Sequence, residues 1–335
     1  MPVVATIPPL TSPPTNVFGL YQYVAQRIPG YDISEYLREL NSAYIHVWEE
    51  VSKLKNHYFE ELKTVTVVAS AGSRTFDLLF NSDGNLNTAV SQRLYQVSRI
   101  RVLPPGGGLF QATSALHPNE QDFIALSANP TASPAQTGPY YWFLNGRGQL
   151  NWALPLAQGT QIEVLFTFWP ISLNIQFAGT VSSSGTAVTG SGTTFTSILQ
   201  PDFQGYLPTA AMGQEQIQSE LICNLNQIYR VLNITSDTAL ATNVAVAPVL
   251  ATGSQYAVAT LPEIPREHIR VIASIATAKM YSLAGDDTRS QEWNGISASN
   301  LQMMKDSLIE RQSNNPPRKQ RFPYGIGRRN RAFLS

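Results

Sequence analysis

The residues best suited to chemistry lie near the C-terminus, where basic and aromatic side chains are interspersed. The last 20 residues carry six basic and no acidic side chains, whereas the preceding 315 residues hold 17 basic and 23 acidic ones. The basic residues are Arg318, Lys319, Arg321, Arg328, Arg329 and Arg331, and the aromatic residues among them are Phe322, Tyr324 and Phe333. Guanidinium and ammonium groups bind phosphate or carboxylate, and aromatic rings fill apolar pockets. The segment is therefore predicted to dock on a partner.

The composition of this tail leaves three readings open. It suits an acidic groove on another protein, the phosphates of a nucleic acid, or a tail that only aids solubility. Residues 314–335 are not expected to fold alone, because Asn314-Asn315-Pro316-Pro317 ends the preceding helix and two glycines dilute the apolar residues. We expect the tail to be extended until it binds.

Catalytic and metal chemistry find little support in the sequence. Adjacent carboxylates occur at Glu49-Glu50, Glu60-Glu61 and Asp286-Asp287. Neighbouring side chains on a helix point about 100° apart, so such pairs do not form an acid and a base acting together. The histidines, including His46 and His57, are scattered, and Cys223 lies in an apolar run that predicts a buried, inert thiol. We therefore expect no catalytic residue, no cofactor and no metal.

The overall composition indicates a subunit of an assembly. Only 14% of the residues are charged and 43% are hydrophobic, which is little charge for a chain that must stay soluble as a monomer. No apolar run is long enough to cross a membrane, and the N-terminus lacks the features of a signal peptide. We expect a chain that is made and kept in the cytosol, without membrane contact, unless an assembly carries it elsewhere.

Periodicity predicts the elements that position these residues. Residues 1–30 contain prolines at positions 2, 8, 9, 13, 14 and 29, which predict an extended arm lying over a neighbour, with one short adhesive turn around Phe18. Asp32 and Glu35 then form a capping-box pattern. Apolar residues at spacings of three and four follow as far as Tyr58, which predicts a helix of roughly thirty residues and about 45 Å.

The remaining chain alternates between strand and helix patterns. A β region extends to about residue 170, with its clearest hairpin around Asn145-Gly146, and it completes a unit over 31–175. Residues 176–261 are predicted to form an inserted small β-sandwich or barrel, since 178–260 contain only five charged residues among many Thr, Ser, Gly, Ala and Val. Residues 262–313 have the pattern of a helix pair, and 314–335 form the basic tail. The expected fold class is α+β: a helical core, made of a long N-terminal helix and a C-terminal helix pair, with a β region and the inserted β domain.

This order of elements resembles the head-to-tail adaptor (connector or neck) proteins of tailed bacteriophages. The matching stretches are Tyr140-Tyr141-Trp142-Phe143-Leu144-Asn145-Gly146 through Ile162 to Pro170, Leu261-Pro262-Glu263-Ile264-Pro265-Arg266-Glu267-His268, Ala276-Thr277-Ala278 and Gly285-Asp286-Asp287. The resemblance implies a homo-oligomeric ring of twelve copies in the neck of the virion, beneath the portal protein, with the basic tail reaching into the portal. It also implies contact with a tail nozzle, tube or fibre proteins, passage of packaged double-stranded DNA through the ring, and assembly in the host cytoplasm.

A second resemblance concerns the inserted region alone. Gly179-Thr180-Val181, Val188 to Phe195, Ile228-Tyr229-Arg230-Val231, Ile234 to Leu240 and Tyr256-Ala257-Val258 are similar to a β cassette of virion structural proteins. One alternative is a carbohydrate-binding fibre or spike module, which the Ser/Thr-rich cassette and a set of aromatic residues suggest. That set is Tyr140, Tyr141, Trp142, Trp152 and Trp169. An enzyme acting on the cell wall is a third, more distant reading.

Overall fold

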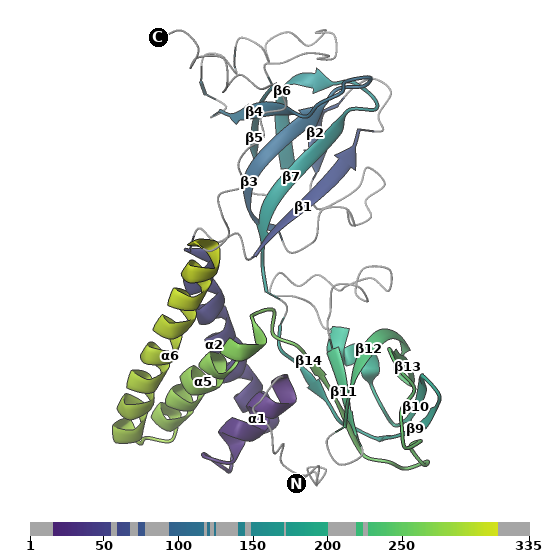
Figure 1. Ribbon diagram of the computed structural model, residues 1–335, viewed down its shortest axis with the longest axis vertical. Coiled ribbons are helices and arrows are strands. Elements are labelled where there is room, and N and C mark those ends of the chain that lie inside the picture. Colours follow the sequence, from purple (N-terminus) through teal and green to yellow (C-terminus); the bar gives the residue numbers. More distant parts are fainter. Residues whose placement is uncertain are drawn as a thin grey trace, which may run out of the picture.

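The chain folds into two β units and a layer of helices. The computed structural model describes residues 16–54, 59–67, 73–77, 94–116, 119–120, 124, 140–144, 149–170, 172–199, 219–223 and 227–313. One sheet occupies one end of the long axis, and the helices and the second sheet lie side by side at the other end (Figure 1).

The described α-helices are α1 (Val17–Ala25), α2 (Ile33–Ser52), α5 (Arg270–Leu283) and α6 (Asp287–Ser313), with short 3₁₀ turns η1 (Phe195–Leu199) and η2 (Arg266–His268). The strands of the first sheet are β1 (Glu60–Thr66), β2 (Ser73–Asp77), β3 (Leu94–Leu103), β4 (Gln111–Ala115), β5 (Tyr140–Leu144), β6 (Gln149–Leu156) and β7 (Gln161–Phe168). Those of the second sheet are β8 (Ile175–Gln176), β9 (Thr180–Ser184), β10 (Ala187–Ser191), β11 (Ser219–Cys223), β12 (Gln227–Ser236), β13 (Ala239–Thr242) and β14 (Tyr256–Thr260).

The first sheet has the strand order β1-β7-β3-β4-β5-β6-β2. All of its pairs are antiparallel except β4 with β5. β5 and β6 pair as the sequence predicts, with Leu144 opposite Leu150, and the turn before β7 has Gly159 at a φ of +82°. Apolar residues from β3, β5, β6 and β7 share one core, because alternate side chains of each strand point to the same side of the sheet.

The second sheet is antiparallel throughout, in the order β8-β14-β11-β12-β13-β10-β9. Its two ends approach each other, because Val181 of β9 and Ser254, just before β14, exchange backbone hydrogen bonds of 2.9 and 3.1 Å. The sheet thus curls around a core that includes Phe195, Leu221 and Val258. Charged residues are few here, so this core and its turns, rather than ion pairs, hold the unit together.

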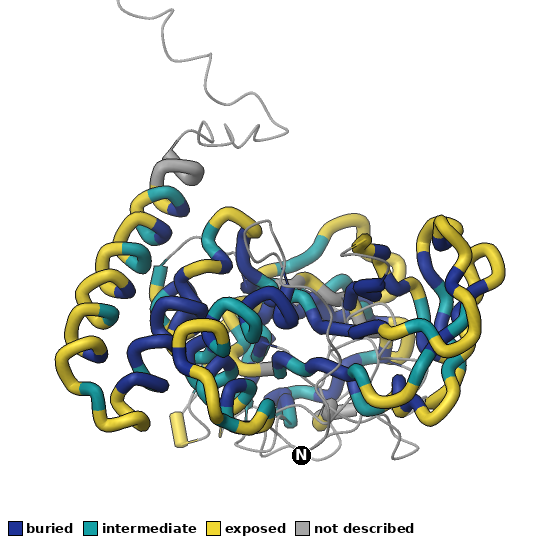
Figure 2. Tube along the Cα trace, turned by 90° about the horizontal axis from the view of Figure 1, so that it is seen from below, coloured by how far each residue is buried: buried dark blue, intermediate teal, exposed yellow. Residues whose placement is uncertain are grey.

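The helices pack against the second sheet and share a core with it. Asp32 and Glu35 form the predicted capping box at the start of α2. Ile222 of β11 and Ala257 of β14 belong to the same apolar cluster as the buried faces of α1, α2 and α5. Every residue of β11 and β14 is buried, since these two strands lie between the helical core and the core of their own sheet. Figure 2 shows this burial along the inner helices and central strands, whereas α6 is exposed along its outer side.

The expected fold class is wrong. Strands predominate, in two seven-stranded sheets against four described α-helices, so a helical core built on a long N-terminal helix is not present. The helix expected from Asp32 to Tyr58 ends at Ser52, at 20 residues. Phe59 is buried against Trp48, and backbone pairing of β1 with β7 begins at Glu60, so tertiary contacts at the start of β1 override the helical pattern.

The expected extended arm over residues 1–30 also needs correction. Residues 17–25 form the helix α1, with Val17, Leu20 and Val24 fully buried in the helical core. Apolar residues that we assigned to contact with a neighbouring molecule are therefore part of the chain's own core. The first fifteen residues lie outside the described part of the chain.

Candidate interaction site

The tail residues that the sequence singles out all lie outside the described residues. They belong to 314–335, beyond the end of α6 at Ser313, so their role stays a prediction. The same holds for His57, whereas His46 is exposed on α2.

Residues of the adjacent carboxylate pairs take part in structural hydrogen bonds and ion pairs. Asp286 accepts a 3.0 Å hydrogen bond from the backbone N–H of Arg289, which caps the start of α6. Glu60 accepts a 3.1 Å hydrogen bond from the Ser98 hydroxyl. Glu50 bonds to two lysines, while Glu49 is exposed beside it. No group of three His, Cys, Asp or Glu side chains within the described ranges could hold a metal ion.

The single cysteine is buried, as predicted. Cys223 lies on β11 in the core of the second sheet, and burial raises the pKa of its thiol to about 11. A thiol with so high a pKa contains little thiolate at neutral pH, and the thiolate is the reactive form.

The aromatic residues behind the carbohydrate-binding alternative are mostly internal. Tyr140, Trp142 and Trp152 are buried in the core of the first sheet. Trp169 stacks on Trp48, with ring centroids 4.8 Å apart. These rings fill cores and do not form an exposed stacking surface.

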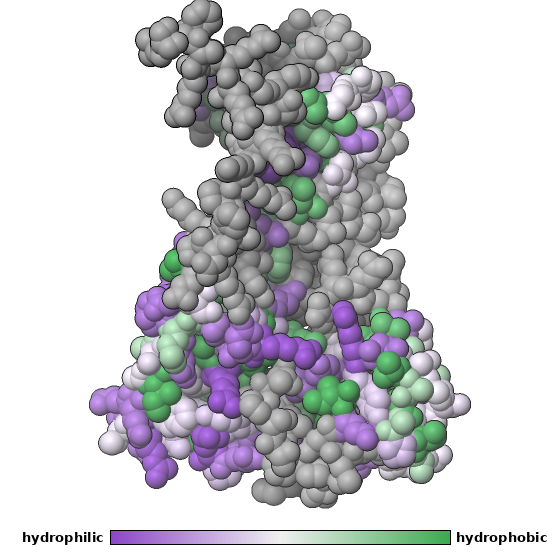
Figure 3. All heavy atoms as spheres, viewed as in Figure 1, coloured by the Kyte–Doolittle hydropathy of each residue, from purple (hydrophilic) through white to green (hydrophobic). Residues whose placement is uncertain are grey.

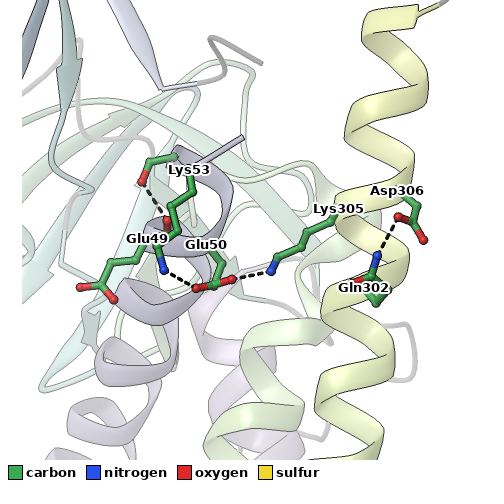
Figure 4. A network of polar contacts seen from close by, with 7 residues as sticks. Glu49, Glu50, Lys53, Gln302, Lys305 and Asp306 are labelled. Atoms are coloured by element: carbon green, nitrogen blue, oxygen red, sulfur yellow. Dashed lines mark hydrogen bonds and ion pairs between the residues drawn. The ribbon is translucent and has the colours of Figure 1, made fainter. Parts of the chain in front are cut away.

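A polar network joins α2 to α6 (Figure 4). The Glu50 carboxylate accepts hydrogen bonds from the ammonium groups of Lys305 on α6 and, at 2.5 Å, of Lys53. The hydrogen bond from Lys305, followed by that from Lys53, lowers the pKa of Glu50 to about 2. The arrangement is a clamp between helices, because both cations are satisfied by the one carboxylate.

A groove of about 610 Å³ lies between α2, α5 and α6. Its polar lining comprises Ser42, His46, Glu49, Lys279, Asn294 and Ser297. The Lys279 ammonium donates a 2.6 Å hydrogen bond to the Ser42 hydroxyl, so its charge is already oriented by the protein.

A buried carboxylate anchors the start of α1. Glu220 of β11 accepts a 2.8 Å hydrogen bond from the Asn16 side-chain amide and a 3.1 Å hydrogen bond from the Arg266 guanidinium. The Asn16 side-chain oxygen meanwhile accepts a 3.0 Å hydrogen bond from the Gly19 N–H and so caps α1. Asn16, which is fully buried, thus caps α1 and also fixes the start of this helix to β11.

The second sheet presents a surface with little charge. Among its described residues, 172–199, 219–223 and 227–260, the charged side chains are Glu220, Arg230 and Asp237, and Glu220 is buried. Ile228 and Leu232 on β12 are 39% and 55% exposed. In the strand register Arg230 lies directly opposite Glu220 of β11, and Ile228 and Leu232 flank Arg230 along β12. These three β12 side chains therefore lie on the same side of the sheet as α1 and α5, which cover β11. In Figure 3 this side of the molecule is pale and green, while the helical side is mostly purple.

We define the β12 strip as Ile228, Arg230 and Leu232. Sequence reasoning missed it, although the alternation of β12 contained part of the signal: inward Tyr229 and Val231 leave Ile228 and Leu232 on the opposite face. An alternating strand does not reveal whether its outer face is covered. Here the helical layer ends over β11 and leaves the strip exposed.

Comparison with protein-family models finds no match, and comparison with curated proteins finds none either. Among the described helices, none combines the length and the apolarity needed to cross a membrane.

Proposed function

We propose that the chain is a structural virion subunit that assembles with copies of itself into a ring in the neck of a tailed phage, beneath the portal. The observation that carries the proposal is the nearly uncharged surface of the second sheet, on which Ile228 and Leu232 are exposed, and which is suited to burial against another subunit. The α6 helix offers a second such surface, since Ile296 and Met303 are exposed seven residues apart on the same helix face.

The positions of these two surfaces favour a ring. In Figure 1, α6 lies on one flank of the molecule and the second sheet on the other. Unlike surfaces on opposite flanks make head-to-tail contacts, which close into rings when the rotation between copies permits. The resemblance to head-to-tail adaptors supplies the identity of the ring and its number of twelve copies.

In this proposal the basic tail joins the ring to the portal. The six basic residues of the tail contrast with the 17 basic and 23 acidic residues of the preceding chain. An acidic body repels DNA and lets it slide through a lumen, while the tail binds an acidic groove of the portal or adjacent phosphates. Docking orders the tail at an entropic cost, which the multivalency of a ring offsets.

Particle mass and shape test the proposal. Mass photometry and negative-stain imaging of the purified chain are expected to give a closed ring of about a dozen copies. A monomer at micromolar concentration would refute the assembly, and a trimer that binds glycans would favour the fibre alternative.

The role of the tail is tested by truncation after Ser313. The truncated chain is expected to keep its fold and ring but to lose co-sedimentation with portal rings. A matched variant with Phe322, Tyr324 and Phe333 changed to Ala retains every tail charge. Loss of portal binding by this variant indicates a protein groove, while unchanged binding with steep salt dependence indicates phosphate. Full portal binding by the truncated chain would refute the role of the tail.

A further inference from the structure

The β12 strip lies next to the point where the N-terminal segment leaves the fold. Asn16 is held by Glu220 on β11, and Glu220 pairs with Arg230, the middle residue of the strip. Neighbouring strands are about 4.8 Å apart. The fifteen residues that precede Asn16 thus start over β11, the strand next to the β12 strip.

The composition of these fifteen residues complements the strip. Their side chains carry no charge, and five of them are prolines. Proline-rich segments favour the polyproline II helix, in which every third side chain lies on the same face and the rise is about 3.1 Å per residue. Val4, Ile7 and Leu10 have this spacing and would form one apolar edge.

The strip offers such a segment the outward side chains of β12. Along its length β12 pairs first with β11, over Gln227–Val231, and then with β13, over Val231–Ser236. A polyproline II segment makes no internal hydrogen bonds and keeps its backbone solvated, so it can lie across a sheet face. The apolar edge of Val4, Ile7 and Leu10 matches Ile228 and Leu232 in chemistry, on either side of the exposed Arg230.

The segment is longer than the strip, so its direction, and not its reach, decides whose strip it meets. At about 3.1 Å per residue, Leu10 lies about 19 Å and Val4 about 37 Å along an extended path from Asn16. The strip covers five residues of β12, which is about 13 Å. Pro13-Pro14, separated from the anchored Asn16 by Thr15 alone, favour extended backbone and so oppose a reversal onto the strip of the same subunit.

We propose that residues 1–15 of one copy dock across the β12 strip of a neighbouring copy, with Val4, Ile7 and Leu10 against Ile228 and Leu232. The Asn16–Glu220 junction sets the direction in which the segment leaves its own subunit. This inference rests on the proposed self-assembly and assigns one of its contacts. It does not depend on the ring being a virion component.

Disulfide trapping in the full chain tests the exchange. The variant Ile7→Cys with Leu232→Cys is oxidised and run on a non-reducing gel. Cys223 is buried and serves as the internal background in the wild type. The expected result is a ladder of dimers and larger species that disappears on reduction. A cross-link confined to monomers, or none in an assembled particle, would overturn the proposal.

A pair of matched substitutions measures the contribution of the strip. Leu232→Asp is expected to weaken self-association by about tenfold or more, because it places a charge in an apolar contact. Leu109→Asp makes the same change at a leucine in the loop between β3 and β4 that is 76% exposed, and is expected to leave association unchanged. Equal effects of the two, with both variants folded by circular dichroism, would refute the assignment.

Failure of this inference can be told apart from failure of the proposed function. An intact ring without intermolecular cross-links removes the arm exchange and leaves the proposed function standing. A wild-type chain that remains monomeric removes both.

Discussion

The junction between Asn16 and Glu220 allows a quantitative test of how α1 is held. Asn16 is 0% exposed and makes two side-chain hydrogen bonds, one to the Gly19 N–H and one to the Glu220 carboxylate. Asn16→Ala removes the helix cap, at about 1 kcal/mol, and the hydrogen bond to the carboxylate, at about 1.5 to 3 kcal/mol. The expected loss in the free energy of unfolding is therefore about 3 kcal/mol.

A double-mutant cycle separates these two contributions. Asn16→Ala, Glu220→Ala and the double variant are unfolded in urea at one fixed protomer concentration, since assembly makes the midpoint depend on concentration. The expected coupling energy is about 1.5 to 3 kcal/mol. A control cycle pairs Asn16→Ala with Ser98→Ala, whose hydroxyl bonds Glu60 in the first sheet. Its coupling is expected to be below about 0.5 kcal/mol, because Ser98 and Asn16 share no hydrogen-bond partner and lie in different units.

Hydrogen exchange provides the structural readout for the same variants. With nine residues, α1 is too short to be stable alone, so its amides should lose protection in Asn16→Ala more than those of α5. A coupling energy under about 0.5 kcal/mol between Asn16 and Glu220, or unchanged protection of α1, would refute the reasoning.

Two further predictions follow from the described geometry. The pKa of Glu50 is lowered from 4.5 to about 2 by Lys305 and Lys53, so its contribution to stability is full above pH 4.5 and is lost as the pH falls towards 2. Glu50→Gln should therefore flatten the decline in unfolding free energy over that range, measured by urea unfolding at several pH values, and an unchanged decline would contradict the clamp. Gly179→Ala should destabilise by about 2 to 5 kcal/mol, because φ is +83° and the new Cβ would lie 2.4 Å from the Ser191 carbonyl oxygen. Its matched control, Gly185→Ala, has a φ of +60° with no heavy atom within 4 Å and should cost about 1 to 2 kcal/mol in thermal or urea unfolding, and equal losses for the two would count against the close backbone packing at Gly179.

Local patterns in the sequence predict many individual elements. The capping box at Asp32 and Glu35, the pairing of β5 with β6 and the strand β7 all follow from residues close together in the chain. The burial of Cys223 also follows from its apolar neighbours. The tail residues 314–335 and their partner stay predictions, because they lie outside the described residues.

The same local patterns misjudge the balance of helix and strand. The apolar period of α2 continues past Ser52, but the burial of Phe59 and the pairing that starts at Glu60 end the helix earlier. Apolar residues of α1 suggest contact with a neighbour, yet Val17 and Leu20 fill the chain's own core. Such outcomes depend on which surfaces meet, and periodicity does not contain that information.

The charge-poor character of residues 178–260, the basic C-terminus and the period of each strong helix or strand can be read from neighbouring residues alone. The fold adds the contact of Asn16 with Glu220 across 204 positions, and a helical layer that covers β11 but leaves Ile228 and Leu232 of β12 exposed. These features cannot be read locally, because burial is a relation between distant segments. An apolar side chain on β11 and one on β12 have the same preference for burial, and the packing of the helices over β11 buries the first and leaves the second exposed.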